Sequence, residues 1–224
     1  MKVGIIGISG RMGAALSQAT LKSDALVGGV SSVTTPEEWE SVVKNSDVLA
    51  DFSVPEAALR AAEMARKYKI PLVSGTTNFS ENNFARFREY SRDIPLLHSS
   101  NFSVCVHLMA VLLKKCEKIL QDFDFSITER HNRRKKDAPS GTALFLAKQI
   151  DKPAQTVSIR SGGICGDHVC DFIGENEMLT ISHRAFNRDI FAAGALNCAR
   201  WLRGKNPGFY SMNDYLKEKI DCPI

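Results

Sequence analysis

The segment Lys2–Gly13 reads K-V-G-I-I-G-I-S-G-R-M-G. Its apolar first part predicts a β-strand, and the spacing of apolar residues over Arg11–Leu21 predicts a helix. Gly7, Gly10 and Gly13 mark the turn between them, where backbone N–H groups can bind a pyrophosphate. The spacing is G-x-x-G-x-x-G and not the usual G-x-G-x-x-G. The segment therefore predicts the start of a dinucleotide-binding fold, and a tight turn without a ligand is the alternative interpretation.

The alternation of strand and helix patterns continues to about residue 102. Short apolar strands separated by helices indicate a parallel α/β sheet, here of Rossmann-like type. The predicted strands are Lys2–Ile6, Ala25–Val30, Val48–Phe52, Pro71–Ser74 and Pro95–His98. Ligands bind such sheets at the carboxyl ends of the strands, so the segments at these ends should converge. They are Gly7–Gly13, Phe52-Ser53, Gly75–Thr77 and Ser99–Phe102.

Two helices have predicted start signals. Thr35 and Glu38 have the spacing of a capping box, in which each side chain accepts a hydrogen bond from the other residue's backbone. Ser53, two residues before Pro55, predicts a second N-cap by the same logic. We therefore expect both helices to begin with side-chain caps.

The end of the second predicted strand bears on the choice of cofactor. Dinucleotide folds commonly place Asp or Glu there to hold the ribose hydroxyls. Here Ser31 and Ser32 follow the strand, with no acidic residue and no arginine nearby in the sequence. The sequence thus leaves the choice between NADH and NADPH open.

The pattern changes after Val104. Strands now follow one another without helices between them, which predicts an open, mostly antiparallel or mixed sheet in a second, α+β domain. We expect residues 1–102, with a C-terminal return over about 189–224, to form the dinucleotide-binding domain, and residues 103–188 to form a substrate-binding and oligomerisation domain. The predicted elements are helix Val104–Leu120, strand Asp124–Thr128, helix Gly141–Ile150, strands Thr156–Ser161, Ile164–Phe172 and Met178–Arg184, and helix Phe191–Arg203.

A cationic segment stands out in this second domain. Glu129–Ala143 reads E-R-H-N-R-R-K-K-D-A-P-S-G-T-A, and we expect it to form a loop between a strand and a helix. Such a loop suits holding a small anion while moving a proton. A solvated face and a nucleic-acid patch are the alternatives. Pro139 interrupts any amphipathic helix there and no aromatic residues alternate with the charges, which argues against nucleic acid.

Composition narrows the classes of protein. The chain has 224 residues, 44% of them apolar, and a net charge of +4, which is the ordinary soluble globular range. No run approaches the roughly 18 apolar residues of a membrane span, so we expect no membrane partner and a cytoplasmic location. Six cysteines without a C-x-x-C pair predict reduced thiols and no metal site.

Motifs in both halves resemble one family, that of 4-hydroxy-tetrahydrodipicolinate (dihydrodipicolinate) reductase. The resemblance follows the chain in order over nearly its whole length, and the block at 129–143 is the most specific part of it. The motifs are G-x-x-G-R-M-G at 7–13, D-F-S at 51–53, G-T-T at 75–77, N-F-S-V at 101–104, E-x-H-x-x-x-K-x-D-A-P-S-G-T-A at 129–143, R-x-G-x-x-x-G-x-H at 160–168 and H-x-A-x-x-R at 183–188.

The resemblance implies reduction of a small cyclic dicarboxylate to tetrahydrodipicolinate with NADH or NADPH, in a homotetramer. It implies that His131 is a proton donor and acceptor, that Lys135 is a proton donor, and that Gly141 and Thr142 hold a substrate carboxylate. It also implies contacts with the cofactor. The cofactor-binding candidates are Gly7, Ile8, Ser9, Gly10, Arg11, Met12, Phe52, Gly75, Thr76, Thr77, Ser99, Ser100, Asn101 and Phe102.

The residue types suit this chemistry. Hydride addition to a conjugated imine builds electron density that a proton must neutralise, and histidine can donate a proton near neutral pH. The chain departs from the family at Asn132, where a second histidine is common; asparagine can still donate a hydrogen bond to a carboxylate. A catalytically silent dinucleotide-binding sensor is the alternative function, but a sensor needs no proton donors.

Overall fold

The computed structural model describes residues 1–220 and divides into two compact units. The first unit combines Met1–Phe102 with the chain from Asp189 onward, and the second unit spans Ser103–Arg188. The chain therefore leaves the first unit once and returns to it. Among the described residues, no helix is both long and apolar enough to cross a membrane.

The first unit is built on a parallel sheet of six strands in the order β10-β5-β4-β3-β1-β2. The predicted Rossmann-like parallel sheet is confirmed. The sixth strand was not predicted, because its three residues carry no clear strand pattern and pair only at the edge of the sheet. The strands are β1 (Lys2–Ile6), β2 (Ala25–Val30), β3 (Val48–Asp51), β4 (Leu72–Ser74), β5 (Pro95–His98) and β10 (Gly208–Tyr210).

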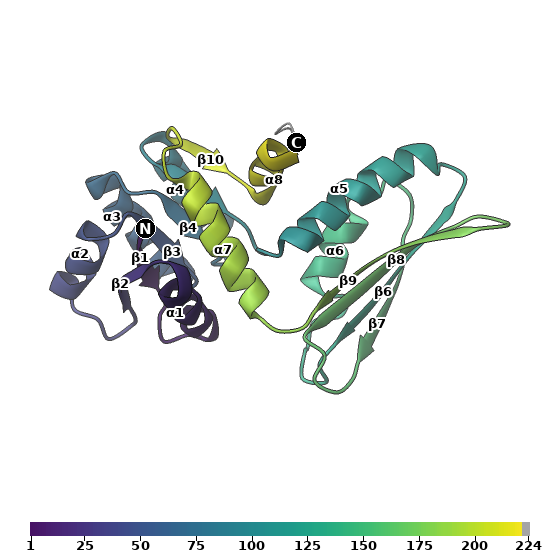
Figure 1. Ribbon diagram of the computed structural model, residues 1–224, viewed down its shortest axis with the longest axis horizontal. Helices are drawn as coiled ribbons and strands as arrows, with labels where there is room; N and C mark the ends of the chain where they lie inside the picture. Colours follow the sequence, from purple (N-terminus) through teal and green to yellow (C-terminus); the bar gives the residue numbers. More distant parts are fainter. Residues whose placement is uncertain (221–224) are drawn as a thin grey trace. The chain divides into compact units, whose positions relative to one another are not determined.

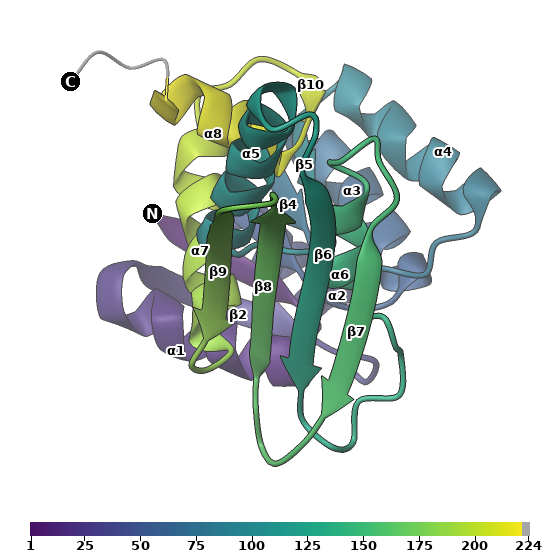
Figure 2. The same cartoon turned by 90° about the vertical axis from the view of Figure 1, so that its right-hand side faces the viewer.

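Helices cover both faces of this sheet. Figure 2 shows α1 and α7 together on one side of the strands and α2, α3 and α4 on the other. Their buried apolar side chains, with those of the strands, form the core of the unit. The helices are α1 (Arg11–Ser23), α2 (Pro36–Lys44), α3 (Pro55–Tyr68), α4 (Glu81–Glu89, followed by the 3-10 turn Tyr90–Arg92), α7 (Asp189–Leu202) and α8 (Met212–Ile220).

The two predicted helix caps have different outcomes. The capping box at α2 is confirmed: Thr35 Oγ1 accepts from the Glu38 backbone at 3.3 Å, and Glu38 accepts from the Thr35 backbone at 2.9 Å. The predicted Ser53 cap is wrong, because Val54 is the N-cap of α3 and makes no side-chain cap. The Ser53 hydroxyl instead donates to Asp51, a buried carboxylate that needs donors.

The second unit contains a sheet of four strands in the order β7-β6-β8-β9, seen face-on in Figure 2. Only the β6–β7 pair is parallel among these pairings, which confirms the predicted mixed, mostly antiparallel sheet. Two helices pack their apolar side chains on one face of it. The elements are α5 (Val104–Ile119), β6 (Asp124–His131), α6 (Gly141–Ala147), β7 (Gln155–Arg160), β8 (Gly166–Ile173) and β9 (Met178–Ala185).

The cationic segment does not begin as a loop. Strand β6 continues to His131, so Glu129 and His131 are strand residues, which corrects the expected end at Thr128. The physical reason is that β6 is a central strand: Glu129 pairs with Ser158 on β7 and with His168 on β8. Pairing on both sides extends the strand into a charged sequence that would not form one by itself.

A close backbone approach in the first unit gives a stability prediction. A Cβ at Gly194 on α7 would lie 1.9 Å from the Phe102 carbonyl oxygen, so no side chain fits there. We expect Gly194→Ala to lower the free energy of unfolding by about 1–3 kcal/mol or more, as overpacking does. Urea denaturation followed by circular dichroism measures this. Gly163→Ala, whose Cβ would meet no atom within 4 Å, is the matched control; equal stability of both variants would contradict the prediction.

Candidate active site

The glycine turn after β1 has the geometry of a phosphate cradle. Gly7 has φ of +84°, which favours glycine, and its N–H donates to the Val30 carbonyl at 2.9 Å. A Cβ at Gly13 would lie 2.2 Å from the Gly7 carbonyl oxygen, so only glycine allows α1 to start this close to the turn. Gly10 is the N-cap of α1 and provides no side-chain cap. The first backbone N–H groups of α1 are therefore left without a capping side chain.

The ends of the neighbouring strands meet beside this turn. A Cβ at Gly75 would lie 2.3 Å from the Phe52 ring, and the rings of Phe52 and Phe102 are 5.4 Å apart. The Ser53 backbone donates to the Thr76 hydroxyl at 2.9 Å. The structure thus brings together residues from three of the segments that the sequence placed at the carboxyl edge of the sheet.

A buried acid underlies these strand ends. Asp51 is fully buried at the end of β3 and accepts hydrogen bonds from the hydroxyls of Ser53 and Ser74, the latter at 2.6 Å. Burial raises the pKa of Asp51 above its ordinary value, and these hydrogen bonds oppose the rise. Asp51 therefore links β3 to β4 directly below the segment 75–77.

A cavity of about 510 Å³ opens at the glycine turn. Gly7, Ser9, Gly10 and Phe52 are the predicted cofactor residues that line it, whereas Ile8 packs its side chain against Gly29. The segments 75–77 and 99–102 lie outside this cavity. Its full lining is Ile6, Gly7, Ser9, Gly10, Val30, Ser31, Ser32, Thr34, Trp39, Phe52, Ser53, Val54, Glu56, Ala57 and Arg60.

The cavity also has an arginine that sequence spacing does not reveal. Arg60 of α3 lies with its guanidinium carbon 4.5 Å from the centre of the Trp39 ring. Both side chains line the cavity together with Ser31 and Ser32 at the end of β2. The sequence shows no arginine near these serines, but the crossover from β3 to α3 brings one there. Arg60 could have been found in the sequence as an arginine in the first turns of the helix that follows the third strand.

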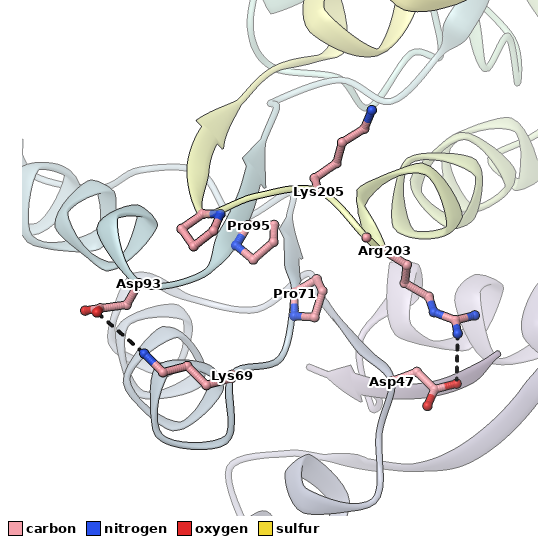
Figure 3. Close-up of a pocket in the computed structure, with 9 residues that line it drawn as sticks. Asp47, Lys69, Pro71, Asp93, Pro95, Arg203 and Lys205 are labelled. Carbon is pink, nitrogen blue, oxygen red and sulfur yellow. Dashed lines mark ion pairs between the residues drawn. The ribbon is translucent and has the colours of Figure 1, made fainter.

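A second cavity, of about 480 Å³, lies at the opposite edge of the same sheet (Figure 3). Its cations are paired: Lys69 with Asp93 at 3.6 Å and Arg203 with Asp47 at 4.0 Å. It adjoins the amino ends of β3, β4 and β5, the edge at which parallel α/β sheets do not bind their ligands. We therefore place the candidate nucleotide site at the glycine turn.

In the second unit, the helix-covered face of the sheet changes character along β6. Because side chains alternate, Phe125, Ile127, Glu129 and His131 lie on the same face, and all four are buried. The first two belong to the apolar core with α5 and α6. The last two are ionisable, and His168 of β8 pairs opposite Glu129. One end of this face is therefore a hydrophobic core and the other a polar site.

Glu129 is the centre of that polar site. Its Oε1 accepts from Arg160 Nη2 at 2.6 Å and from the Ser140 backbone at 3.2 Å, and its Oε2 accepts from Arg160 Nη1 at 2.9 Å and contacts His131 Nδ1. Burial by itself raises the pKa of Glu129, but hydrogen bonds from Arg160, Ser158 and His131 outweigh it and hold the pKa at about 2. The carboxylate is ionised at physiological pH.

Three histidines line up across the strands. The ring centres of His131 and His168 are 5.1 Å apart, edge to face, and those of His168 and His183 are 6.3 Å apart. Burial lowers the pKa of His168 to about 4, and the neighbouring histidines act in the same direction. His168 is thus neutral at physiological pH, and its Nε2 lies 3.3 Å from the Ser140 hydroxyl.

The other predicted residues of the second unit lie in the turn after β6 and at the start of α6. Lys135 forms an ion pair with Asp137 at 2.9 Å and donates its backbone N–H to the Asn132 carbonyl at 3.1 Å. The Asn132 side-chain oxygen accepts from the Arg134 backbone at 3.0 Å. Gly141 starts α6, followed by Thr142, and a Cβ at Gly141 would face open space. The polar site of the second unit therefore contains His131 and the start of α6, with Lys135 in the adjoining turn.

A parallel sheet with a glycine turn at a helix start, in one chain with a histidine–carboxylate site, is the arrangement expected of a nucleotide-dependent oxidoreductase. Models of two family domains match this chain: "Dihydrodipicolinate reductase, N-terminus" over residues 1–102 and "Dihydrodipicolinate reductase, C-terminus" over residues 105–216. The chain belongs to the dihydrodipicolinate reductase family.

Individual relatives agree with this. A 4-hydroxy-tetrahydrodipicolinate reductase of Rickettsia bellii is 35% identical over 99% of this chain and 96% of its own length. That of Thermosipho africanus is 36% identical over 97% of this chain and 99% of its own. In fold, the chain is similar to a dipicolinate-bound dihydrodipicolinate reductase from Paenisporosarcina, with a TM-score of 0.80 at 20% identity over 95% of this chain and 98% of that one.

The activity follows from family membership. The enzyme reduces 4-hydroxy-tetrahydrodipicolinate to tetrahydrodipicolinate with NADH or NADPH, a step of diaminopimelate and lysine biosynthesis. The first unit fits such a cofactor, because Gly7 and Gly13 keep a Cβ out of the turn, where it would collide with the backbone, and the cavity continues from there past Trp39. When bound, the cofactor supplies the hydride. The sequence did not point to three residues at these candidate sites: Trp39 and Arg60, which line the cavity, and Glu129, which contacts His131.

Proposed function

We propose that His131 provides the proton that accompanies hydride transfer and that Lys135 is a second proton donor. The observation that carries this proposal is the position of His131 at the polar end of the β6 face, with its Nδ1 on the ionised Glu129. A carboxylate on Nδ1 leaves Nε2 as the nitrogen that can exchange a proton with a substrate. Lys135 lies in the turn that begins directly after His131, and its ammonium group is 2.9 Å from Asp137.

The substrate carboxylates require donors close to that proton. We assign this role to Asn132, Gly141 and Thr142, following the family motif at 129–143. The open space at Gly141 supports the assignment, since a carboxylate can approach the backbone there. A related reductase of the same fold is described as dipicolinate-bound, which supports a small planar dicarboxylate as the substrate class. The second unit is then the substrate-binding domain.

The first unit is then the dinucleotide-binding domain. We assign the pyrophosphate to the turn at Gly7–Met12 and the nicotinamide end of the cofactor to Gly75–Thr77 and Ser99–Phe102, because the segments after β4 and β5 lie next to Phe52. The ribose and adenine then occupy the cavity beside Trp39. Every residue in the predicted cofactor set belongs to one of these segments or is Phe52 itself.

We propose that the enzyme prefers NADPH to NADH. The end of β2 carries no carboxylate to hold a free 2′-hydroxyl, whereas Ser31, Ser32 and Arg60 together line the cavity. A guanidinium with neighbouring hydroxyls is suited to a 2′-phosphate. Glu56 also lines the cavity, one helical turn before Arg60, and would repel a phosphate. We expect the attraction between Arg60 and the 2′-phosphate to exceed this repulsion, because the guanidinium is held in the cavity over the Trp39 ring.

The second unit would also assemble the enzyme into a homotetramer. The face of its sheet that α5 and α6 leave uncovered bears exposed apolar side chains, here called the apolar sheet face: Val157, Ile159, Ile173 and Met178, which are 55%, 38%, 41% and 61% exposed. Exposed apolar residues gathered on one sheet face are typical of a surface that another subunit covers. If this face contacts two neighbouring subunits, the assembly closes as a tetramer.

We place the enzyme in the cytoplasm. All five cysteines among the described residues are free thiols, which is typical of a reducing compartment; Cys222 lies outside the described residues. The substrate and cofactor classes are also those of intracellular metabolism.

The proton-transfer roles predict a loss of turnover. We expect His131→Ala and Lys135→Ala each to lower kcat by about 10²-fold or more, the usual scale for a positioned acid. The assay follows the nicotinamide absorbance with enzymatically generated dihydrodipicolinate. Lys136→Ala, a neighbouring cation without an assigned role, is the control for Lys135. Near wild-type kcat in both test variants would refute the roles, and no turnover by the wild type with either cofactor would refute the activity itself.

The cofactor preference predicts a selective change in binding. Arg60→Ala should weaken the binding of NADPH by about tenfold, which is the scale of one hydrogen bond to a charged group. The affinity for NADH should stay within about threefold of the wild-type value. Calorimetric titration of both cofactors without substrate measures this. Arg66→Ala is the matched control, because Arg66 lies on the same helix 5.0 Å from the Tyr90 ring. Equal weakening of both cofactors by Arg60→Ala would contradict a role in reading the phosphate.

The assembly proposal predicts a change in mass. Val157→Lys should shift the protein from tetramer to smaller species, because it buries a charge in the proposed interface. Light scattering coupled to size-exclusion chromatography measures the mass. Val33→Lys, at a valine 88% exposed in the first unit, should leave the mass unchanged. A monomeric wild type at micromolar concentration would refute the proposal.

A further inference from the structure

The proposed role of His131 leaves the buried Glu129 unexplained. Its side chain is 0% exposed, although a charged group is expensive to bury without compensation. Compensation comes from hydrogen-bond donors: two from Arg160, one from the Ser140 backbone, one from His131 and the Ser158 side chain. The question is whether this arrangement only stabilises the sheet or also serves the reaction.

A second buried carboxylate on the same sheet provides the comparison. Asp167 of β8, 5% exposed, accepts from Arg184 at 2.8 Å and from Arg130 at 3.4 Å. It lies on the opposite face from Glu129, because the sheet register pairs it with Arg130, the residue next to Glu129 on β6. Arginines alone are thus enough to hold a buried carboxylate in this sheet. Glu129 differs in that it also contacts His131.

The ring of His131 is constrained on several sides. Its Nδ1 contacts Glu129, and its edge packs against His168 with ring centres 5.1 Å apart. Its Nε2 lies beside Gly166, where a Cβ would come within 3.2 Å. The absence of a side chain at Gly166 keeps space beside the nitrogen that the proposed function uses. The contact with Glu129 is the polar constraint on Nδ1, whereas His168 and Gly166 limit the position of the ring.

We propose that Glu129 is a positioning residue of the reductase reaction: it holds His131 with the proton of the neutral ring on Nδ1 and stabilises the protonated ring before it donates from Nε2. This inference rests on the proposed function of His131. Arg160 acts one step further away by holding Glu129 in place and ionised. Carboxylates that orient a histidine in this way fix its tautomer and the orientation of its ring.

The groups facing this pair are few. On its own strand and the neighbouring strands, the titratable or charged groups are Arg160, the neutral His168 and, beyond it, His183. From the segment before α6, Asp137 approaches Arg160 through its backbone carbonyl at 2.6 Å. Glu129 is therefore the one anion in direct contact with the His131 ring among the described residues.

The test compares Glu129→Gln with Asp167→Asn. Glutamine keeps an acceptor oxygen and the side-chain length but removes the charge, so we expect kcat to fall about 10–100-fold with little change in KM. Asp167→Asn removes an equally buried charge from the other face of the sheet and should not reproduce this selective fall in kcat.

A double variant separates the two proposals. In a His131→Ala background, Glu129→Gln should change kcat less than about twofold, because its effect passes through the missing ring. A loss that persists in that background, or a wild-type kcat in Glu129→Gln, overturns the positioning role and leaves the proposed function intact. Full kcat in His131→Ala overturns the proposed function instead.

A measurement on the unaltered protein keeps the inference testable if Glu129→Gln does not fold. Nitrogen-15 NMR of histidine-labelled enzyme distinguishes the two neutral tautomers, with the His131 signals identified by their loss in His131→Ala. We expect the proton of the neutral ring on Nδ1. A neutral ring protonated only on Nε2 would overturn the proposal, since Nδ1 would then have no proton to share with Glu129.

Discussion

The buried ion pair of Glu129 and Arg160 is the contact on which the second unit depends. Removing one partner of such a pair leaves an uncompensated charge, at a cost of about 3–5 kcal/mol in other proteins. The pair joins β6 to β7, and the same carboxylate holds the chain at Ser140 as it enters α6. The Glu129 carboxylate thus joins two strands and also contacts His131, the proposed proton donor.

The first unit obeys a different constraint, the absence of side chains where backbones meet. Gly7, Gly13 and Gly194 each exclude a Cβ because a carbonyl oxygen lies too close. These contacts bring α1 and α7 near the strands, and they leave the glycine turn open for a phosphate. The geometry of the first unit thus depends on close backbone contacts, whereas that of the polar site in the second unit depends on charged side chains.

The sequence predicted the parallel sheet and the second mixed sheet because the spacing of apolar residues and the helix caps can be read from residues close together in the chain. It missed β10, whose three residues become a strand only by pairing with β5. It ended β6 at Thr128, since pairing on both sides cannot be read from one charged segment. Arg60 was hidden for a similar reason: it lies far from Ser31 in sequence, and only the fold brings them to one cavity. Roles of site residues came from motif resemblance, not from local pattern.

The order in which the chain passes through its two units affects how the protein folds during translation. Helix α7 and strand β10 complete the first unit but are translated after the whole second unit. Until they emerge from the ribosome, β5 has an unpaired edge, and α7 does not yet cover β3, β4 and β5 on the face that it shares with α1. The first unit therefore cannot fold completely until these elements have been translated, whereas the second unit can fold before that.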